Sequence, residues 1–318
     1  MDIPSASRIT QDVLDELSKV IVGQQRALEE MTIAMLSGGH VLLEGVPGTG
    51  KTLMARTLAA LTGASFKRIQ FTPDLMPSDI LGVNVYNTAT GDFAFRPGPI
   101  FADIVLGDEI NRAPAKTQSA MLEAMQEQQA SIDGVVHELS NVFTVFATQN
   151  PVEFEGTYPL PEAELDRFMM KVRVAYPPEE MEASILDNYH AGFDDKDLAS
   201  ADIRQVMDIE SMRDLRRVVR GLHIERDVRR YITAIVRSTR TVPQVAMGAS
   251  PRSGVMLMHA AKAKAVLLGR EFVTPDDVKQ IALPVLRHRI LLHPEVEVEG
   301  RTTDDCLNQL LASIEVPR

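Results

Sequence analysis

Short apolar runs alternate with stretches of helical spacing along the first half of the chain. Five runs have strand character: residues 40–44, 67–71, 102–107, 142–148 and 168–175. Helical stretches separate several of these runs. Because strands that alternate with helices form parallel sheets, the pattern predicts an α/β core, a five-stranded parallel sheet with helices on both faces.

Two amphipathic helices are predicted before the first strand. In residues 7–19 the apolar positions fall at helical spacing, and Ser7 is the expected N-cap. Ile21-Val22-Gly23-Gln24 interrupts the pattern, and a second helix runs to Leu36, where Gly38-Gly39 closes it.

The pattern changes near Pro177-Pro178. Beyond this point the periodicity is mainly helical, and no stretch reads convincingly as a strand. We therefore expect two domains, an α/β domain over residues 1–177 and an all-helical lid domain over residues 178–318.

Two hairpins are predicted as insertions in the first domain. Residues 83–86 and 93–96 flank a turn rich in Thr, Gly and Asp, and residues 129–132 and 135–138 flank Asp133-Gly134. The hairpins are either surface decoration or protrusions that touch a partner or line a pore, and the pattern leaves both readings open.

Composition narrows the class of protein. The net charge of −11 argues against a protein that coats nucleic acid, and the absence of Trp argues against base-stacking platforms. No apolar run approaches the ~20 residues of a membrane span, and the first residues do not resemble a signal peptide. Cys306 is the single cysteine, so no internal disulfide forms. We expect a soluble cytoplasmic protein without nucleic-acid binding or direct membrane insertion.

A phosphate-binding loop follows the first predicted strand. Gly45-Val46-Pro47-Gly48-Thr49-Gly50-Lys51-Thr52 matches G-x-x-x-x-G-K-[ST], and a helical stretch from Leu53 to Leu61 follows it. Glycines allow successive backbone N–H groups to point at phosphate oxygens beside a helix N-terminus. Lys51 supplies charge for the β- and γ-phosphates, and the Thr52 hydroxyl is placed to bind Mg²⁺. The predicted ligand is a nucleoside triphosphate with Mg²⁺, bound by residues 45–53.

Two later strands end in groups that triphosphate hydrolysis needs. Asp108 and Glu109 follow the run Ile104-Val105-Leu106-Gly107. Asp108 would hold Mg²⁺ directly or through water, and Glu109 would polarise the attacking water. Asn150 ends the next strand and would hold that water from the other side, although an Asn before Pro is by itself usually a turn.

For Arg167, for Arg112 and for a cluster of arginines in the second domain, the sequence leaves two interpretations open. Arg167, in Leu165-Asp166-Arg167-Phe168, suits transition-state stabilisation in a neighbouring subunit or a local pair with Asp166. Arg112 suits either a subunit interface or a local ion pair. Ten arginines stand against five acids between Arg204 and Arg240, which indicates solvated helix faces more than a docking surface.

These motifs, in this order, resemble those of an AAA+ ATPase. Four segments are similar to the MoxR family in particular: the phosphate loop, Asp108-Glu109-Ile110-Asn111-Arg112-Ala113, Ala147-Thr148-Gln149-Asn150-Pro151 and Glu155-Gly156-Thr157-Tyr158-Pro159-Leu160-Pro161-Glu162-Ala163. The resemblance implies Asn150 as sensor 1, Arg167 as arginine finger and Arg252, from the lid, as sensor 2. It also implies that Val22, Gly23 and Gln24 border the adenine, and that the hairpins are the helix-2 insert and the pre-sensor-1 hairpin.

The function that the resemblance implies is an ATP-hydrolysing, chaperone-like motor. Such motors assemble into rings, here a hexamer, and remodel or activate a client protein, often with a partner that carries a von Willebrand factor A domain and sometimes in metal or cofactor insertion. One alternative is a chelatase-like or DNA-directed motor on the same fold. Another is a scaffold that binds ATP with little turnover, against which Glu109, Asn150 and Arg167 together argue.

Overall fold

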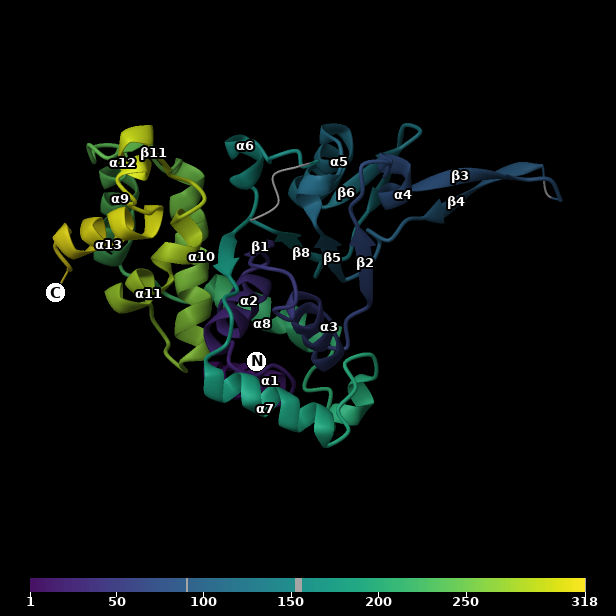
Figure 1. Cartoon of the computed structure of the whole chain (residues 1–318), viewed down its shortest axis with the longest axis horizontal. Helices are drawn as coiled ribbons and strands as arrows, with labels where there is room; N and C mark the ends of the chain where they lie inside the picture. Colours follow the sequence, from purple (N-terminus) through teal and green to yellow (C-terminus); the bar gives the residue numbers. More distant parts are fainter. Residues whose placement is uncertain (90, 152–155, 318) are drawn as a thin grey trace.

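A parallel sheet forms the centre of the first part of the molecule (Figure 1). In the computed structural model, residues 1–89, 91–151 and 156–317 are described. The sheet has the order β2-β5-β8-β1-β9, with β1 (Val41–Glu44), β2 (Phe66–Gln70), β5 (Ile104–Asp108), β8 (Thr144–Gln149) and β9 (Met170–Arg173). All neighbouring pairs are parallel, so the predicted five-stranded sheet is confirmed.

Alternating side chains of the central strands enter two apolar clusters on opposite faces of the sheet. On β1, Val41 and Leu43 join one cluster, and Leu42 joins the other. The first cluster includes residues of α1 (Ile3–Val20), α2 (Gln25–Leu36) and α3 (Lys51–Leu61), whereas the second includes residues of α4 (Pro77–Leu81) and α5 (Ala115–Glu127). Because both faces are covered, these strands read as continuous apolar runs.

The first helix begins earlier than predicted. Asp2 is the N-cap of α1, and its carboxylate accepts a hydrogen bond from the Ser5 N–H at 3.0 Å. Ser7 lies inside the helix, and its hydroxyl donates to the Leu267 carbonyl at 3.0 Å. The expectation that Ser7 caps the helix is therefore wrong, because a better-placed carboxylate stands five residues earlier.

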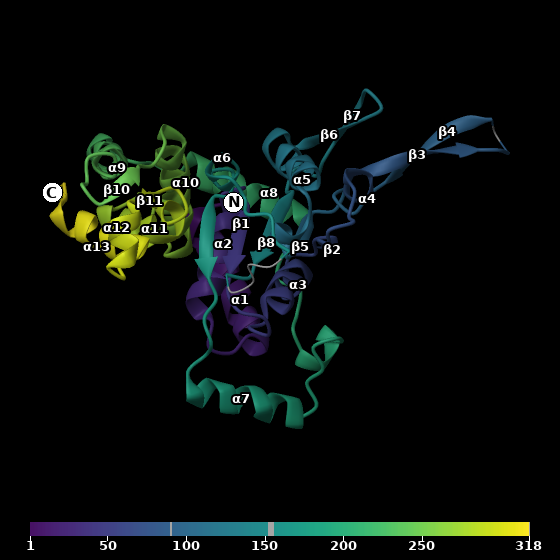
Figure 2. The same cartoon turned by 45° about the horizontal axis from the view of Figure 1, so that its top comes forward.

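Both predicted hairpins are present. They are formed by β3 (Gly82–Asn87) with β4 (Asp92–Pro97) and by β6 (Gln129–Ile132) with β7 (Val135–Glu138). Figures 1 and 2 show both of them projecting from the body of the molecule. The Asn84 amide donates to Asp133 at 2.7 Å, and the Phe95 ring stacks on His137 with centroids 4.1 Å apart. The base of the β3–β4 hairpin is therefore held against the β6–β7 hairpin, including its turn.

The C-terminal part is mainly helical. Its helices are α7 (Glu179–His190), α8 (Ile209–Gly221), α9 (Arg226–Ser238), α10 (Pro251–Leu267), α11 (Pro275–Leu286), α12 (Pro294–Val298) and α13 (Thr303–Ser313), with the short 3₁₀ turn η2 (Leu198–Ala201). It also contains an antiparallel ribbon of β10 (Val245–Met247) and β11 (Leu291–Leu292), which the sequence pattern did not predict. Strands of two or three residues are too short to show a period of two.

A buried arginine joins α8 to the first domain. Arg216 is almost fully buried, and its guanidinium donates to the carbonyls of Met35, Asn141 and Val142 and to the Thr144 hydroxyl. Burial lowers the pKa of Arg216 to about 10, so the side chain stays charged at neutral pH. The interpretation of these arginines as solvated is therefore wrong for Arg216.

Two short helical segments connect strands of the sheet. The 3₁₀ turn η1 (Ile110–Arg112) follows β5, and α6 (Glu162–Leu165) precedes β9. No helix in the described parts of the chain has both the length and the apolar character that a membrane crossing requires. The domain boundary at residue 177 stays a prediction. Residues of α8 belong to the same apolar cluster as residues of α1 and α2. Helix α7, which lies between the boundary and α8 in the chain, stands apart from the rest of the molecule (Figure 2).

Candidate functional site: a phosphate pocket joined to a base pocket

Two glycines shape the phosphate loop, one where a side chain would clash and one where the backbone is left-handed. A Cβ on Gly45 would lie 2.3 Å from the Val174 carbonyl oxygen, so this residue permits a close approach of two backbone segments. Gly50 is the N-cap of α3 and has φ +81°, a left-handed conformation that costs other residues roughly 1 kcal/mol. The helix therefore begins with its N-terminal N–H groups directed at the loop.

Lys51 holds its ammonium group against the loop. Its Nζ donates to the carbonyls of Gly45 and Val46, both at 2.7 Å. Burial lowers the pKa of Lys51, and the carboxylates of Asp108 and Glu109 act in the opposite direction. Gly45 and Val46 thus position the lysine.

A cavity of about 380 Å³ lies in front of the loop. Its lining residues are Pro47, Gly48, Thr49, Gly50, Lys51, Thr52, Leu53, Asp108, Glu109, Thr148, Asn150, Tyr189 and Asp195. The carboxyl ends of β1, β5 and β8 meet here, as expected for adjacent parallel strands. The structure therefore brings the predicted residues Lys51, Thr52, Asp108, Glu109 and Asn150 together.

Thr148 organises the two carboxylate residues, a role that the sequence reasoning missed. Its hydroxyl donates to Asp108 Oδ1 at 2.6 Å and accepts from the Glu109 N–H at 2.8 Å. Glu109 adopts a left-handed backbone conformation with φ +58°. A threonine directly after the apolar residues Val145, Phe146 and Ala147 was the available signal.

Side chains of the neighbouring strand β2 hold the carboxylates from the solvent side. Arg68 Nη2 lies 2.6 Å from Asp108 Oδ2, and the Gln70 amide donates to Glu109 Oε2 at 2.8 Å. Arg112 Nε lies 3.2 Å from the same Glu109 oxygen, so the local ion pair left open for Arg112 is present. Sequence reasoning missed Arg68 and Gln70, because their position depends on the register of β2 with β5.

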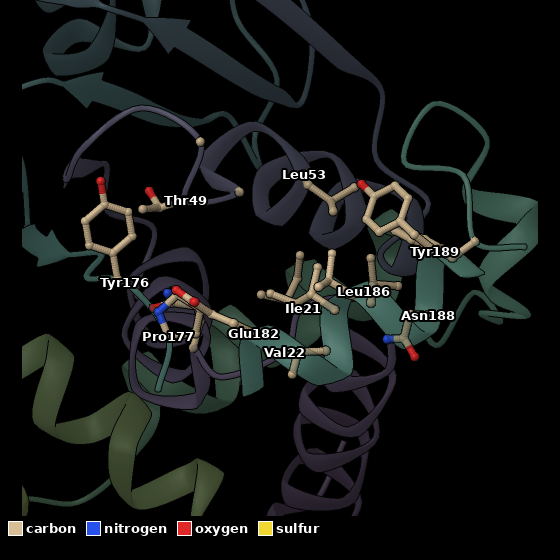
Figure 3. A pocket seen from close by; sticks show the side chains of 16 residues that line it. Ile21, Val22, Thr49, Leu53, Tyr176, Pro177, Glu182, Leu186, Asn188 and Tyr189 are labelled. Atoms are coloured by element: carbon tan, nitrogen blue, oxygen red, sulfur yellow. The ribbon is translucent and has the colours of Figure 1, made fainter. Parts of the chain in front are cut away.

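A second cavity, of about 430 Å³, adjoins the first. Figure 3 shows apolar side chains at its centre, including Ile21, Val22, Leu53 and Leu186. Val22 and Gln24 line this cavity, as predicted for residues that border a base. Gly23 lies beside it with φ +78°, and a Cβ there would lie 2.8 Å from Pro177 Cβ.

The two cavities form one continuous site. Both are lined by the same residues of the loop and its helix and by one tyrosine, namely Gly48, Thr49, Gly50, Leu53 and Tyr189. An apolar chamber beside a glycine loop and a lysine fits a nucleoside triphosphate. The hydroxyl of Thr52 and the carboxylate of Asp108 are oxygen ligands of the kind that Mg²⁺ prefers.

Arg167 and Arg252 lie away from this site. The Met169 N–H donates to the His40 carbonyl at the start of β1, so Arg167 lies beyond that edge of the sheet, whereas the phosphate loop follows the end of β1. In Figure 1, α6 and α7 accordingly lie on opposite sides of the sheet. Ser250, two residues before Arg252, donates to Asp166 at 3.2 Å. The structure thus places both arginines at one edge, and neither lines the two cavities.

The alternative pairing for Arg167 is not observed among the described residues. Asp166 pairs instead with Arg289, whose Nε lies 2.7 Å from Asp166 Oδ1. Glu155, part of one of the four family-like segments, lies outside the described residues, as do residues 152–154.

Comparisons with known proteins point to one family. The sequence pattern of the ATPase family associated with various cellular activities (AAA) matches residues 40–170, and that of the AAA lid domain matches residues 237–310. The uncharacterized protein YeaC of Bacillus subtilis is 45% identical over 304 residues, which cover 96% of this chain and 93% of YeaC. The chaperone MoxR1 of Mycobacterium tuberculosis is 40% identical over 312 residues, which cover 95% of this chain and 81% of MoxR1.

A solved structure extends the likeness to three dimensions. It is the crystal structure of a candidate ATPase from Cytophaga hutchinsonii, with 39% identity and a TM-score of 0.91. The match covers 99% of this chain and 97% of that protein. The likeness thus includes the sheet and the C-terminal helices, and the chain belongs to the MoxR family of AAA ATPases.

Proposed function

We propose that the protein hydrolyses ATP with Mg²⁺ and uses the cycle to remodel or activate a client protein. The observation that carries this proposal is the meeting of Lys51, Thr52, Asp108, Glu109 and Asn150 in one cavity. These are the groups that phosphoryl transfer to water requires: a phosphate clamp, oxygen ligands for a metal and a group that orients water.

Each side chain has a distinct role in this mechanism. Lys51 neutralises charge on the β- and γ-phosphates, and its present partners, two loop carbonyls, are weaker acceptors than phosphate. Thr52 and Asp108 would hold Mg²⁺, which supplies charge neutralisation when bound. Glu109 polarises the attacking water, and Asn150 fixes it from the neighbouring strand.

Arg167 and Arg252 would act on the nucleotide of a neighbouring subunit. Their place at the sheet edge away from the phosphate loop supports this role, because neither side chain lines its own site. Arginine supplied in this way stabilises transition-state charge only when the neighbour is present. We therefore propose a closed ring, a hexamer, as the active form.

The work of the ring is proposed to be chaperone-like. The relative MoxR1 is named a chaperone, which supports this class of activity. The projecting hairpins offer surfaces for a partner, which we infer to carry a von Willebrand factor A domain, and the client interaction serves activation or the insertion of metal or cofactor. A reducing compartment such as the cytoplasm is proposed because the single cysteine, Cys306, leaves the chain without an internal disulfide.

Replacement of Glu109 by Gln tests the hydrolysis proposal. We expect the Glu109→Gln variant to bind ATP with a Kd within about threefold of the parent, because the phosphate clamp is intact. Its kcat should fall by about 100-fold or more, because the water loses its polarising group. Glu123→Gln, an exposed site on α5, is the matched control and should leave kcat unchanged.

Two further measurements distinguish an ATP-hydrolysing motor from a scaffold that binds ATP without turnover. The Lys51→Ala variant should lose ATP binding measured by isothermal titration calorimetry. If the assembled parent protein turns over ATP with Mg²⁺ no faster than Lys51→Ala, the protein is a scaffold and the proposal is wrong.

The partner can be sought with the same variants. Glu109→Gln purified with ATP from its native lysate should retain a protein with a von Willebrand factor A domain, identified by mass spectrometry. Lys51→Ala is the control, since this variant is expected not to bind ATP. Equal recovery from both variants, or chelatase subunits in place of such a protein, would contradict this partner assignment.

A further inference from the structure

One face of α9 carries arginines and hydroxyl groups. Between Arg226 and Arg240 the chain has five arginines and one acid, Asp227. An open cavity of about 610 Å³ runs along this face. Its lining side chains lie at the spacing of successive helical turns and, among the described residues, include no carboxylate: Arg230, Thr233, Ala234, Arg237, Ser238, Arg240 and Thr241. We call this surface the arginine face, and its charge fits an anionic partner.

Most of the charge on the arginine face is not neutralised within the subunit. Arg226, Arg229 and Arg237 form no ion pair in the parts of the chain that the structure describes. Arg230 pairs with Asp227 at 3.2 Å, but both side chains are exposed, and such pairs contribute little. Nucleic acid is a poor fit, because no aromatic side chain of the described residues lines this cavity and the chain carries a net charge of −11.

The arginine face lies beside the lid arginine that is proposed to act in a neighbouring subunit. Arg240 Nε donates to the Ala249 carbonyl at 2.9 Å, and the Ala249 N–H donates to the Thr239 hydroxyl at 2.9 Å. These bonds hold the end of α9 against the start of α10, where Arg252 lies in the first turn. A neighbour whose nucleotide site receives Arg252 therefore also comes close to the arginine face.

An acidic segment, residues 179–197, borders the nucleotide site of each subunit. Glu182 lines one of the two cavities of the site, and Asp195 lines the other. Negative charge beside a triphosphate disfavours binding of that anion unless positive charge offsets it. The segment contains one lysine and seven exposed carboxylate residues, namely Glu179, Glu180, Glu182, Asp187, Asp194, Asp195 and Asp197.

We propose that the arginine face of one subunit docks on the acidic segment of the next subunit in the ring. Figures 1 and 2 both show α9 and α7 in well-separated parts of the molecule, so the two surfaces meet only between copies. The contact aligns Arg252 with the neighbour's nucleotide and brings positive charge to its acidic border. This inference rests on the proposed ring and adds the surfaces that align its subunits.

Charge reversal on each surface tests the docking. The double variants Arg230→Glu/Arg237→Glu and Glu180→Arg/Asp187→Arg should each raise the dissociation constant between subunits by about 100-fold, because like charges then face each other. Analytical ultracentrifugation with Mg²⁺ and a nonhydrolysable ATP analogue measures this constant. None of the four changed residues lines the two nucleotide cavities.

Combining the two reversals should restore assembly. The quadruple variant that carries all four changes should assemble within about tenfold of the parent's dissociation constant, because opposite charges face each other again. Arg213→Glu/Arg217→Glu, at two exposed positions on α8, is the matched control and should assemble as the parent does. A quadruple variant that stays dissociated would show that the two surfaces do not meet.

Assembly of the parent separates this inference from the proposed function. A parent that stays monomeric with ATP and Mg²⁺ would overturn the ring, and the docking with it. If the parent and both double variants assemble equally well, the docking is wrong while the ATPase proposal stands. If Arg230→Glu/Arg237→Glu assembles normally but loses binding to duplex DNA that the parent shows, the occupant of the arginine face is nucleic acid and the docking is wrong.

Discussion

The hydroxyl of Thr148 links Asp108, the proposed metal ligand, to Glu109, the proposed water-polarising residue. It donates to Asp108 and accepts from the backbone of Glu109, so one side chain fixes both residues at the end of β5. On the other side, Arg68 and Gln70 hold the same carboxylates. The reactive groups are therefore oriented before a ligand arrives, which lowers the reorganisation that catalysis requires.

Removal of the Thr148 hydroxyl should slow hydrolysis more than it weakens binding. We expect Thr148→Val to lower kcat by about 10- to 100-fold, as loss of an orienting partner typically does, with a smaller change in the Kd of ATP. Steady-state kinetics and calorimetry measure the two quantities. Thr32→Val, at a buried helical threonine bonded to Leu28, is the control; an unchanged kcat for Thr148→Val would refute the positioning role.

His40 makes the stability of the protein depend on pH. Its Nδ1 accepts from the Val145 N–H and its Nε2 donates to the Met125 carbonyl, both at 3.0 Å, so the buried ring is neutral. Burial lowers the pKa of His40 to about 4, below its ordinary value of 6.5. As the pH falls from 6.5 to 4, the unfolded chain binds a proton that the folded chain does not.

The free energy of unfolding should therefore fall through this window, with about 3 kcal/mol lost because of His40. His288, also fully buried with a lowered pKa, contributes in the same direction. Urea unfolding between pH 6.5 and 4.5 should show a slope that is smaller by about 1.4 kcal/mol per pH unit in His40→Gln. Equal slopes in the parent and His40→Gln would contradict this account, and the exposed His190→Gln is the control.

The main elements followed from sequence because their signals are local. Apolar runs located the five strands, and Asp133-Gly134 located the turn of β6 and β7 with φ values of +51° and +81°. The elements that were missed depend on distant partners. The ribbon of β10 and β11 joins segments more than 40 residues apart, and Thr148 gains its role from the register of β8 with β5. The exposed position of α7 likewise has no local signature.

The hairpin of β3 and β4 should tolerate change at its tip. Phe93 is 72% exposed, and its nearest ring is Tyr86 in the same hairpin. Phe93→Ser should alter the free energy of unfolding by less than about 0.5 kcal/mol. Phe95→Ser, which removes a ring stacked on His137, should cost more, about 1–2 kcal/mol. If urea unfolding shows the same decrease in the free energy of unfolding for both variants, the prediction that the tip tolerates change is wrong.

At the scale of the whole molecule, the site is divided between two edges of one sheet. The carboxyl edge carries the phosphate loop and the carboxylates, and the other edge carries Arg167 and Arg252. The sequence motifs identified the phosphate loop, the carboxylates and the two arginines. They did not show that the arginines lie at the opposite edge of the sheet, because that separation is set by the direction of the strands. On the proposed mechanism, a complete set of catalytic groups requires two subunits, each of which contributes one edge.

Mixing two inactive variants tests this division most directly. Lys51→Ala subunits lack the phosphate clamp but keep Arg167, and Arg167→Ala subunits keep the clamp. Each variant alone should assemble and show almost no ATPase activity. Mixed in equal amounts and allowed to exchange, about a quarter of the interfaces should combine an intact clamp with an intact arginine, and activity should return in proportion. Assembled mixtures that stay as inactive as the separate variants, or full activity in Arg167→Ala alone, would contradict a site shared between subunits.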